Sequence, residues 1–209
     1  MKKQSIVFGA LLVLTSGLYA ITGQEVINQL SPAANNFGQN ALNPSKSVSE
    51  QNASLVAWEK ELAKAKVFVI ENSKNLVGVK DSDIINAMSA VEKASMDIIN
   101  ITKITRGISA ADGLRAQQNQ LANVQRNLRT ATDKLSRASM TLANKKEAKN
   151  VVTSIGRFLE QVIQAVDNVI AAKIASGRPA LPPRGSNIPA PSRDLNTPPR
   201  DLPPMFPGN

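Results

Sequence analysis

Proline and arginine near the C-terminus form the clearest candidate for recognition chemistry in this 209-residue sequence. The stretch RPALPPR at 178–184 places Pro179, Pro182 and Arg184 in a P-x-x-P-x-R arrangement. A polyproline II helix presents every third residue alike, and an aromatic groove with an acidic rim binds such a face. The spacing therefore indicates a contact site for an SH3-like domain, although such short motifs are also common in proline-rich spacers.

Two seven-residue units follow this motif and repeat Arg, Asp and Leu in register. They read PSRDLNT at 191–197 and PPRDLPP at 198–204. Repeated units on one chain increase the strength of weak docking. The residues predicted to contact a protein partner here are Arg193, Leu195, Arg200 and Leu202. A spacer lengthened by duplication is the alternative interpretation of the same composition.

Residues for ordinary acid–base and metal chemistry are scarce in this sequence. It has no His and no Cys, which removes the commonest general base and the usual ligands of zinc and haem. No Ser is followed by Lys three positions later, and no glycine-rich phosphate loop is present. Asp81 and Asp83 are predicted to cap a helix start rather than to form a catalytic pair. We therefore expect a non-enzymatic protein with no catalytic residue, cofactor or metal.

The basic excess raises the question of nucleic acid. The formal net charge is +9, and five cations lie on the polar side of one predicted helix: Arg115, Arg126, Arg129, Lys134 and Arg137. Aromatic residues are only 3% of the chain, so few side chains are available to stack on bases. We expect a solvated face with weak attraction to anionic surfaces and no specific nucleic-acid site, while a basic surface or nucleic-acid binder is an alternative.

The first 20 residues have the three parts of a secretory signal peptide. Lys2 and Lys3 precede an apolar run at 6–14, and small and polar residues lead to Ala20, the predicted last residue before cleavage. The run is shorter than the roughly 20 apolar residues of a spanning helix, which favours cleavage over an uncleaved anchor. We expect no transmembrane segment after cleavage, and a periplasmic or secreted protein of a bacterium.

The remaining chain divides into three parts by composition. Residues 21–47 contain Pro32, Gly38 and Pro44 among many Asn and Ser, which predicts a flexible leader. Residues 48–176 predict an all-α, antiparallel helical bundle of about four helices. Residues 177–209 hold 10 of the 12 Pro and predict a disordered proline-rich tail.

Capping residues set the predicted limits of the first two helices. The first is expected over 48–76 with Ser49 at its start, including the apolar KVFVI run that also fits a strand. The second is expected to begin at Asp81 or Ser82 and to end at Gly107.

The third and fourth helices are predicted on either side of a polar hairpin tip. The third is expected over 109–144, opened by a capping pair of Ser109 and Asp112. The tip is placed at 143–150, although one continuous helix is an alternative, and the fourth helix is expected over 147–176 with Gly177 ending it.

Two rows of aliphatic residues seven positions apart are predicted to face the core. They are Val48, Leu55, Leu62, Val69 and Leu76 in the first helix, and Leu114, Leu121, Leu128, Leu135 and Leu142 in the third. A zipper seam needs a second apolar row, and the corresponding positions give only a thin one. They hold Gln117, Val124, Ala131, Ala138 and Lys145. We therefore predict packing within the chain, with a coiled-coil oligomer as the alternative.

These observations predict an exported, non-enzymatic helical-bundle protein that acts by protein–protein interaction or as a structural component of the bacterial envelope. The alternative is a secreted effector whose proline-rich tail binds an SH3-like domain of a host.

Overall fold

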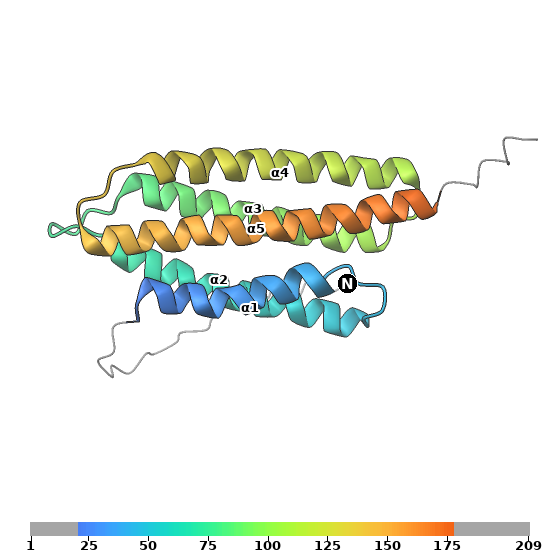
Figure 1. Ribbon diagram of the computed structural model, residues 1–209, viewed down its shortest axis with the longest axis horizontal. Helices are drawn as coiled ribbons and strands as arrows, with labels where there is room; N and C mark the ends of the chain where they lie inside the picture. The colour runs from blue at the N-terminus through green and yellow to red at the C-terminus, as the bar shows by residue number, and fades with distance from the viewer. Residues whose placement is uncertain (1–20, 178–209) are drawn as a thin grey trace, which may run out of the picture. The chain divides into compact units, whose positions relative to one another are not determined.

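The computed structural model describes residues 21–177, and every regular element in that range is a helix (Figure 1). The predicted signal peptide and tail motifs lie outside these residues. The five helices are α1 (Gly23–Asn40), α2 (Val48–Asn72), α3 (Ser82–Arg106), α4 (Ala111–Arg137) and α5 (Ala143–Ser176). The all-α class is confirmed, with five helices where about four were predicted.

Consecutive helices run in opposite directions, so α1, α3 and α5 point the same way (Figure 1). Side-chain contacts between residues far apart in sequence show these directions: Lys134 lies beside Asp83, and Gln118 lies beside Asp167. Helix α5 packs against all four other helices and is the centre of the bundle. One end of the bundle carries the links 73–81 and 138–142 together with the start of α1, and the other carries Gly177.

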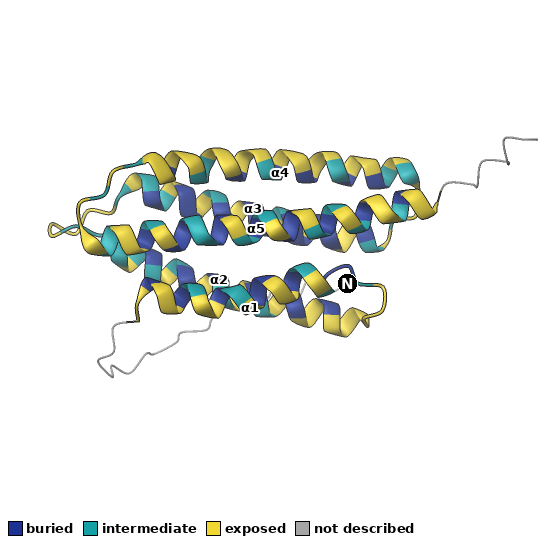
Figure 2. Ribbon diagram, in the orientation of Figure 1, coloured by how far each residue is buried: buried dark blue, intermediate teal, exposed yellow. Residues whose placement is uncertain are grey.

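The interior of the bundle is filled by aliphatic side chains and one indole. Along α5 the buried side faces inward, and exposed residues line the outer surfaces of α2 and α4 (Figure 2). Trp58 is fully buried, and its indole N–H donates to the Ser95 hydroxyl at 2.7 Å. The Phe37 ring lies 6.2 Å from the Trp58 ring, centroid to centroid, which joins α1 to this core.

The flexible leader predicted for residues 21–47 is wrong, because 18 of these residues form α1. A capping box of Thr22 and Glu25 starts the helix, and an apolar side that includes Val26, Leu30 and Phe37 is buried. Pro32 stands inside the helix at an exposed position. Packing against α2 and α5 therefore outweighs the low helix propensity of the Pro, Asn and Gly residues.

The predicted limits of the first two helices are largely correct. Asp81 caps α3 by accepting from the backbone N–H of Asp83, and Gly107 is the C-cap, as expected. Ser47, and not Ser49, caps α2, because Glu50 stands three positions later and completes a capping box. The KVFVI run is helical, as predicted.

The predicted turn between the last two helices is displaced. Helix α4 begins after Ala110 without the expected side-chain cap from Ser109, and it ends at Arg137. Helix α5 begins at Ala143, so the turn is 138–142 and the segment predicted as the hairpin tip is helical. The two helices are separate, and Gly177 is the C-cap of α5 as expected.

The leucine row of α4 is buried within the chain. Leu114, Leu121, Leu128 and Leu135 are each about 1% exposed, in a helix that packs on α3 and α5. Leu142 lies outside the helix and is 37% exposed. Gly156 of α5 allows the close approach of α4, because a Cβ there would lie 2.5 Å from Cγ2 of Thr132. The row thus packs inside the bundle, as predicted.

Candidate functional site

The residues that the sequence assigns to partner binding all lie outside the described part of the chain: Pro179, Pro182, Arg184, Arg193, Leu195, Arg200 and Leu202. Within residues 21–177, the features that could form a site are two depressions, a basic helix face and a group of exposed apolar residues.

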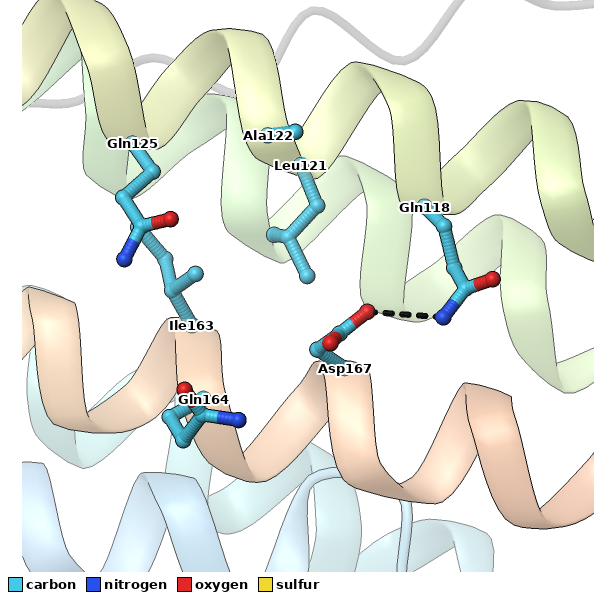
Figure 3. A pocket seen from close by; sticks show the side chains of 7 residues that line it. All are labelled: Gln118, Leu121, Ala122, Gln125, Ile163, Gln164 and Asp167. Carbon is cyan, nitrogen blue, oxygen red and sulfur yellow. Dashed lines mark hydrogen bonds between the residues drawn. The ribbon is translucent and has the colours of Figure 1, made fainter.

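A depression of about 80 Å³ lies between α4 and α5 (Figure 3). Leu121 and Ile163 form its floor, and the amide groups of Gln125 and Gln164 border it. The Gln118 side-chain amide donates to the Asp167 carboxylate at 2.9 Å and closes one side. This volume accommodates only a few water molecules, and its single carboxylate is already hydrogen-bonded.

A second depression, of about 90 Å³, lies between α3 and α4. The Lys134 ammonium and the Asp83 carboxylate border it and form an ion pair at 3.2 Å. In the described residues, no group of three or more acidic side chains is arranged to hold a metal ion.

The basic residues predicted on the polar side of α4 are all exposed. Arg129 pairs with Glu160 at 2.8 Å, and Arg115 pairs with Asp112 at 3.6 Å. Arg126 donates to the side chain of Asn123 on its own helix. Because carboxylates from the same bundle neutralise part of this face, it is a solvated surface rather than a continuous cationic track.

The link 73–81 between α2 and α3, hereafter the hairpin, is the most unusual exposed feature. Its two arms meet in one isolated antiparallel bridge between Lys74 and Lys80. Its turn is folded around Asn75, whose side-chain carbonyl accepts from the backbone N–H of Val77 at 3.0 Å and of Val79 at 2.9 Å. Gly78 adopts a φ of +82°, a conformation that residues with a Cβ rarely adopt. The hairpin is therefore an ordered turn built by specific hydrogen bonds.

The tip of the hairpin is apolar and faces solvent. Leu76 is 99% exposed, Val77 is 85% exposed and Val79 is 61% exposed. Figure 1 shows the hairpin projecting past the first turn of α5, away from the bundle. Isolated exposed aliphatic side chains are ordinary, but three within four residues on a projecting turn indicate a contact surface.

The base of the hairpin is fixed to α5. Asn144 donates through its side chain to the backbone carbonyl of Lys74 at 3.0 Å. The Lys145 ammonium lies 3.3 Å from the Asp81 carboxylate, and both side chains are mostly shielded from water. These contacts hold the tip in a defined orientation relative to the bundle.

The charges beside the tip are of both signs, and two of its lysines are exposed and form no ion pair with the described residues. Lys80 is exposed next to Val79, and Lys146 is exposed on the first turn of α5. Lys74 pairs with Glu71, and its hydrogen bond and charge hold the pKa of Glu71 below the ordinary value. The apolar tip therefore has lysines on both sides.

Sequence reasoning missed this site because it placed Leu76 in the buried row of the first helix. The helix ends at Asn72, and Leu76 lies beyond it. A signal was nevertheless present in the segment NLVGVK: an Asn able to fold a turn and a Gly stand among three aliphatic residues.

Among the helices of residues 21–177, none has the length and apolarity needed to cross a membrane. No protein-family model matches the chain, and comparisons with curated proteins and with solved structures found no match.

Proposed function

We propose that this protein is exported by a bacterium and acts by binding, as an interaction or structural component of the envelope or the medium, rather than by catalysis. The observation that supports it is the contrast between a filled interior and an apolar hairpin held in solvent by Asn75 and Asn144. A bundle with a filled core has its outer surface available for recognition, and rigid exposed aliphatic groups are typical of contact sites.

The proline-rich segment supplies a second contact site in this proposal. Its P-x-x-P-x-R motif at Pro179, Pro182 and Arg184 supports binding to an aromatic groove. If the groove belongs to a host protein, the chain is a secreted effector; if it belongs to the bacterium, the chain is an envelope component.

Export is tested by intact-mass measurement of the protein recovered from the bacterial envelope and medium. The expected mature chain begins at Ile21. Recovery of a chain that still begins at Met1 contradicts cleavage, and retention in the cytoplasm contradicts export.

Binding is tested by placing a photo-cross-linking amino acid at Val77, at Pro182 and, as a control, at Asn127 on the exposed face of α4. We expect adducts to protein or lipid from Val77 and Pro182 in living cells, and few from Asn127. Equal labelling from all three positions, or none from Val77 and Pro182, contradicts the proposal.

A further inference from the structure

We propose that the hairpin docks the bundle on an anionic lipid surface, with Leu76, Val77 and Val79 entering the headgroup layer. This inference rests on the proposed export, because an exported protein of the envelope meets such surfaces. It specifies the partner of the exposed tip and leaves the role of the proline-rich segment unchanged.

The direction and chemistry of the tip suit a lipid surface. The hairpin projects past the first turn of α5 (Figure 1). It carries three exposed aliphatic side chains, of which the most exposed, Leu76, is 99% accessible. A small convex apolar point can enter a lipid surface without any matching cavity in a partner. The end that carries Gly177 then points away from the lipid.

The hairpin also satisfies most of its own backbone donors. The N–H groups of Asn75 and Gly78 donate to backbone carbonyls of the turn, at 3.0 Å to Val79 and 2.9 Å to Asn75. Those of Val77 and Val79 donate to the Asn75 side chain. Unpaired backbone groups oppose entry into an apolar medium, so this pairing lowers the cost of insertion.

Lysine side chains lie directly behind the apolar tip. Lys74 and Lys80 face each other across the bridge. Lys74 is paired with Glu71 and Lys145 with Asp81, so the cations left for an anionic surface are Lys80 and Lys146 on the adjoining turn of α5. Glu147, beside Lys146, accepts from the backbone N–H of Gly23. Lysine stems can extend to anionic headgroups while the aliphatic tip is immersed, an arrangement typical of peripheral membrane attachment.

The size of the apolar surface favours lipid over a protein partner. A stable protein–protein contact takes about 800 Å² from each side and roughly 20 to 30 residues. The projecting apolar surface of the hairpin consists of only three side chains, bordered at once by lysine. Partition of a few aliphatic groups into a bilayer surface is weak and reversible, and nearby cations strengthen it on anionic lipid.

The test measures co-sedimentation of residues 21–209 with vesicles of phosphatidylcholine alone or of phosphatidylcholine mixed with phosphatidylglycerol. This chain holds every described helix, and it lacks the apolar run at 6–14, which would bind lipid by itself. We expect binding to the mixed vesicles and little binding to phosphatidylcholine alone.

Paired variants separate the tip from general surface effects. Leu76→Ser with Val77→Ser is expected to lower the partition coefficient by about tenfold or more. The control, Val48→Ser with Val56→Ser, removes two exposed valines, at 65% and 61%, from α2 and is expected to leave binding unchanged. Lys80→Gln with Lys146→Gln is expected to lower binding by about fivefold for each lysine, and more than Lys60→Gln with Lys103→Gln.

Insertion is measured separately by tryptophan fluorescence. Trp58 is the only native Trp and is fully buried, so it gives a constant background. Val77→Trp is expected to show a blue shift on mixed vesicles, and Val56→Trp to show none. Circular dichroism melts of all variants verify that each is folded.

Three results overturn the inference: no binding to mixed vesicles, equal binding by the tip variant and its control, or no shift from Val77→Trp. Loss of oligomers in the tip variant by light scattering, with vesicle binding retained, assigns the tip to self-association and also overturns it. Each of these results leaves the proposed export and the Pro182 cross-link standing, so failure of this inference is distinguishable from failure of the proposed function.

Discussion

The leucine row of α4 and the hairpin contain the same kind of side chain in opposite surroundings. Leu128 is 1% exposed, whereas Leu76 is 99% exposed. Both belong to rows with seven-residue spacing, at Leu114 to Leu142 and at Val48 to Leu76. The spacing identifies the inward side of a helix, but only the length of the helix and the reach of its neighbours decide which members of a row are covered.

The exposure of the hairpin is not a general property of links in this bundle. The link between α1 and α2 buries its aliphatic residues, with Ala41 fully covered and Leu42 only 7% exposed. The Arg106 guanidinium donates to the Ala41 carbonyl at 3.0 Å and fixes this link against α3. The fold thus covers apolar residues in one link and leaves those of the hairpin in solvent.

The largest expected effect comes from placing a charge at each of the two leucines. Leu128→Asp buries an unpaired carboxylate between α4 and its neighbours and is expected to lower the free energy of unfolding by about 3–5 kcal/mol. Leu76→Asp places the same group in water and is expected to change it by less than about 0.5 kcal/mol. Urea unfolding monitored by circular dichroism measures both. Similar losses for the two variants would show that the hairpin is part of the core.

The next effect tests how closely α4 and α5 approach. Gly156→Ala places a Cβ 2.5 Å from Cγ2 of Thr132, whose hydroxyl is bonded to the Leu128 carbonyl and holds its rotamer. We expect a loss of about 1–3 kcal/mol, reduced by the better helix propensity of Ala. Thr132→Ser removes that methyl group, so the double variant should recover most of the loss. A double variant no more stable than Gly156→Ala would place the strain elsewhere.

Helix boundaries show what the sequence can and cannot predict in this protein. Asp81, Gly107 and Gly177 were predicted correctly because each cap uses a local interaction between neighbouring residues. Helix α1 was missed because its stability comes from contacts with α2 and α5, which are distant in sequence and outweigh the effect of Pro32. Local rules thus predicted the ends of α3 and α5, which carry a glycine cap, but not the ends of α2 and α4 or the recruitment of α1 by tertiary packing.

The candidate site was missed for a related reason. The exposure of Leu76 depends on α2 ending at Asn72 and on the hydrogen bond from Asn144 of α5. The end of α2 is set locally, but the seven-residue spacing continues to Leu76 and hides it. The hydrogen bond joins Asn144 to Lys74, which are 70 positions apart. Composition could identify the turn residues Asn75 and Gly78, but not the direction in which the turn projects.

A smaller effect is expected from the turn itself. Gly78→Ala forces a residue with a Cβ into φ +82° and is expected to cost about 1–2 kcal/mol locally. No other group lies within 4 Å of the added Cβ, so this cost is one of backbone conformation alone. Gly78→Asn should cost less, because Asn tolerates this conformation. Hydrogen exchange at Val77 and Val79 reports the change, and equal exchange in the two variants would contradict this explanation.

The smallest expected change in stability comes from deleting residues 178–209. Helix α5 has its C-cap at Gly177, so the deletion removes no described helix, and the deleted segment holds 10 prolines and few large apolar residues. We therefore expect an unchanged melting temperature, together with loss of the protein partner that the Pro179–Arg184 motif and the tandem units are proposed to bind. Replacing Arg193 and Arg200 together should weaken that binding more than replacing either alone.

Vesicle binding through Leu76 and Val77 should persist in the deleted chain, because the hairpin is intact. A lower melting temperature would make the deleted segment part of the folded core, and retained partner binding would assign that partner to the helices, first to the arginine-bearing side of α4.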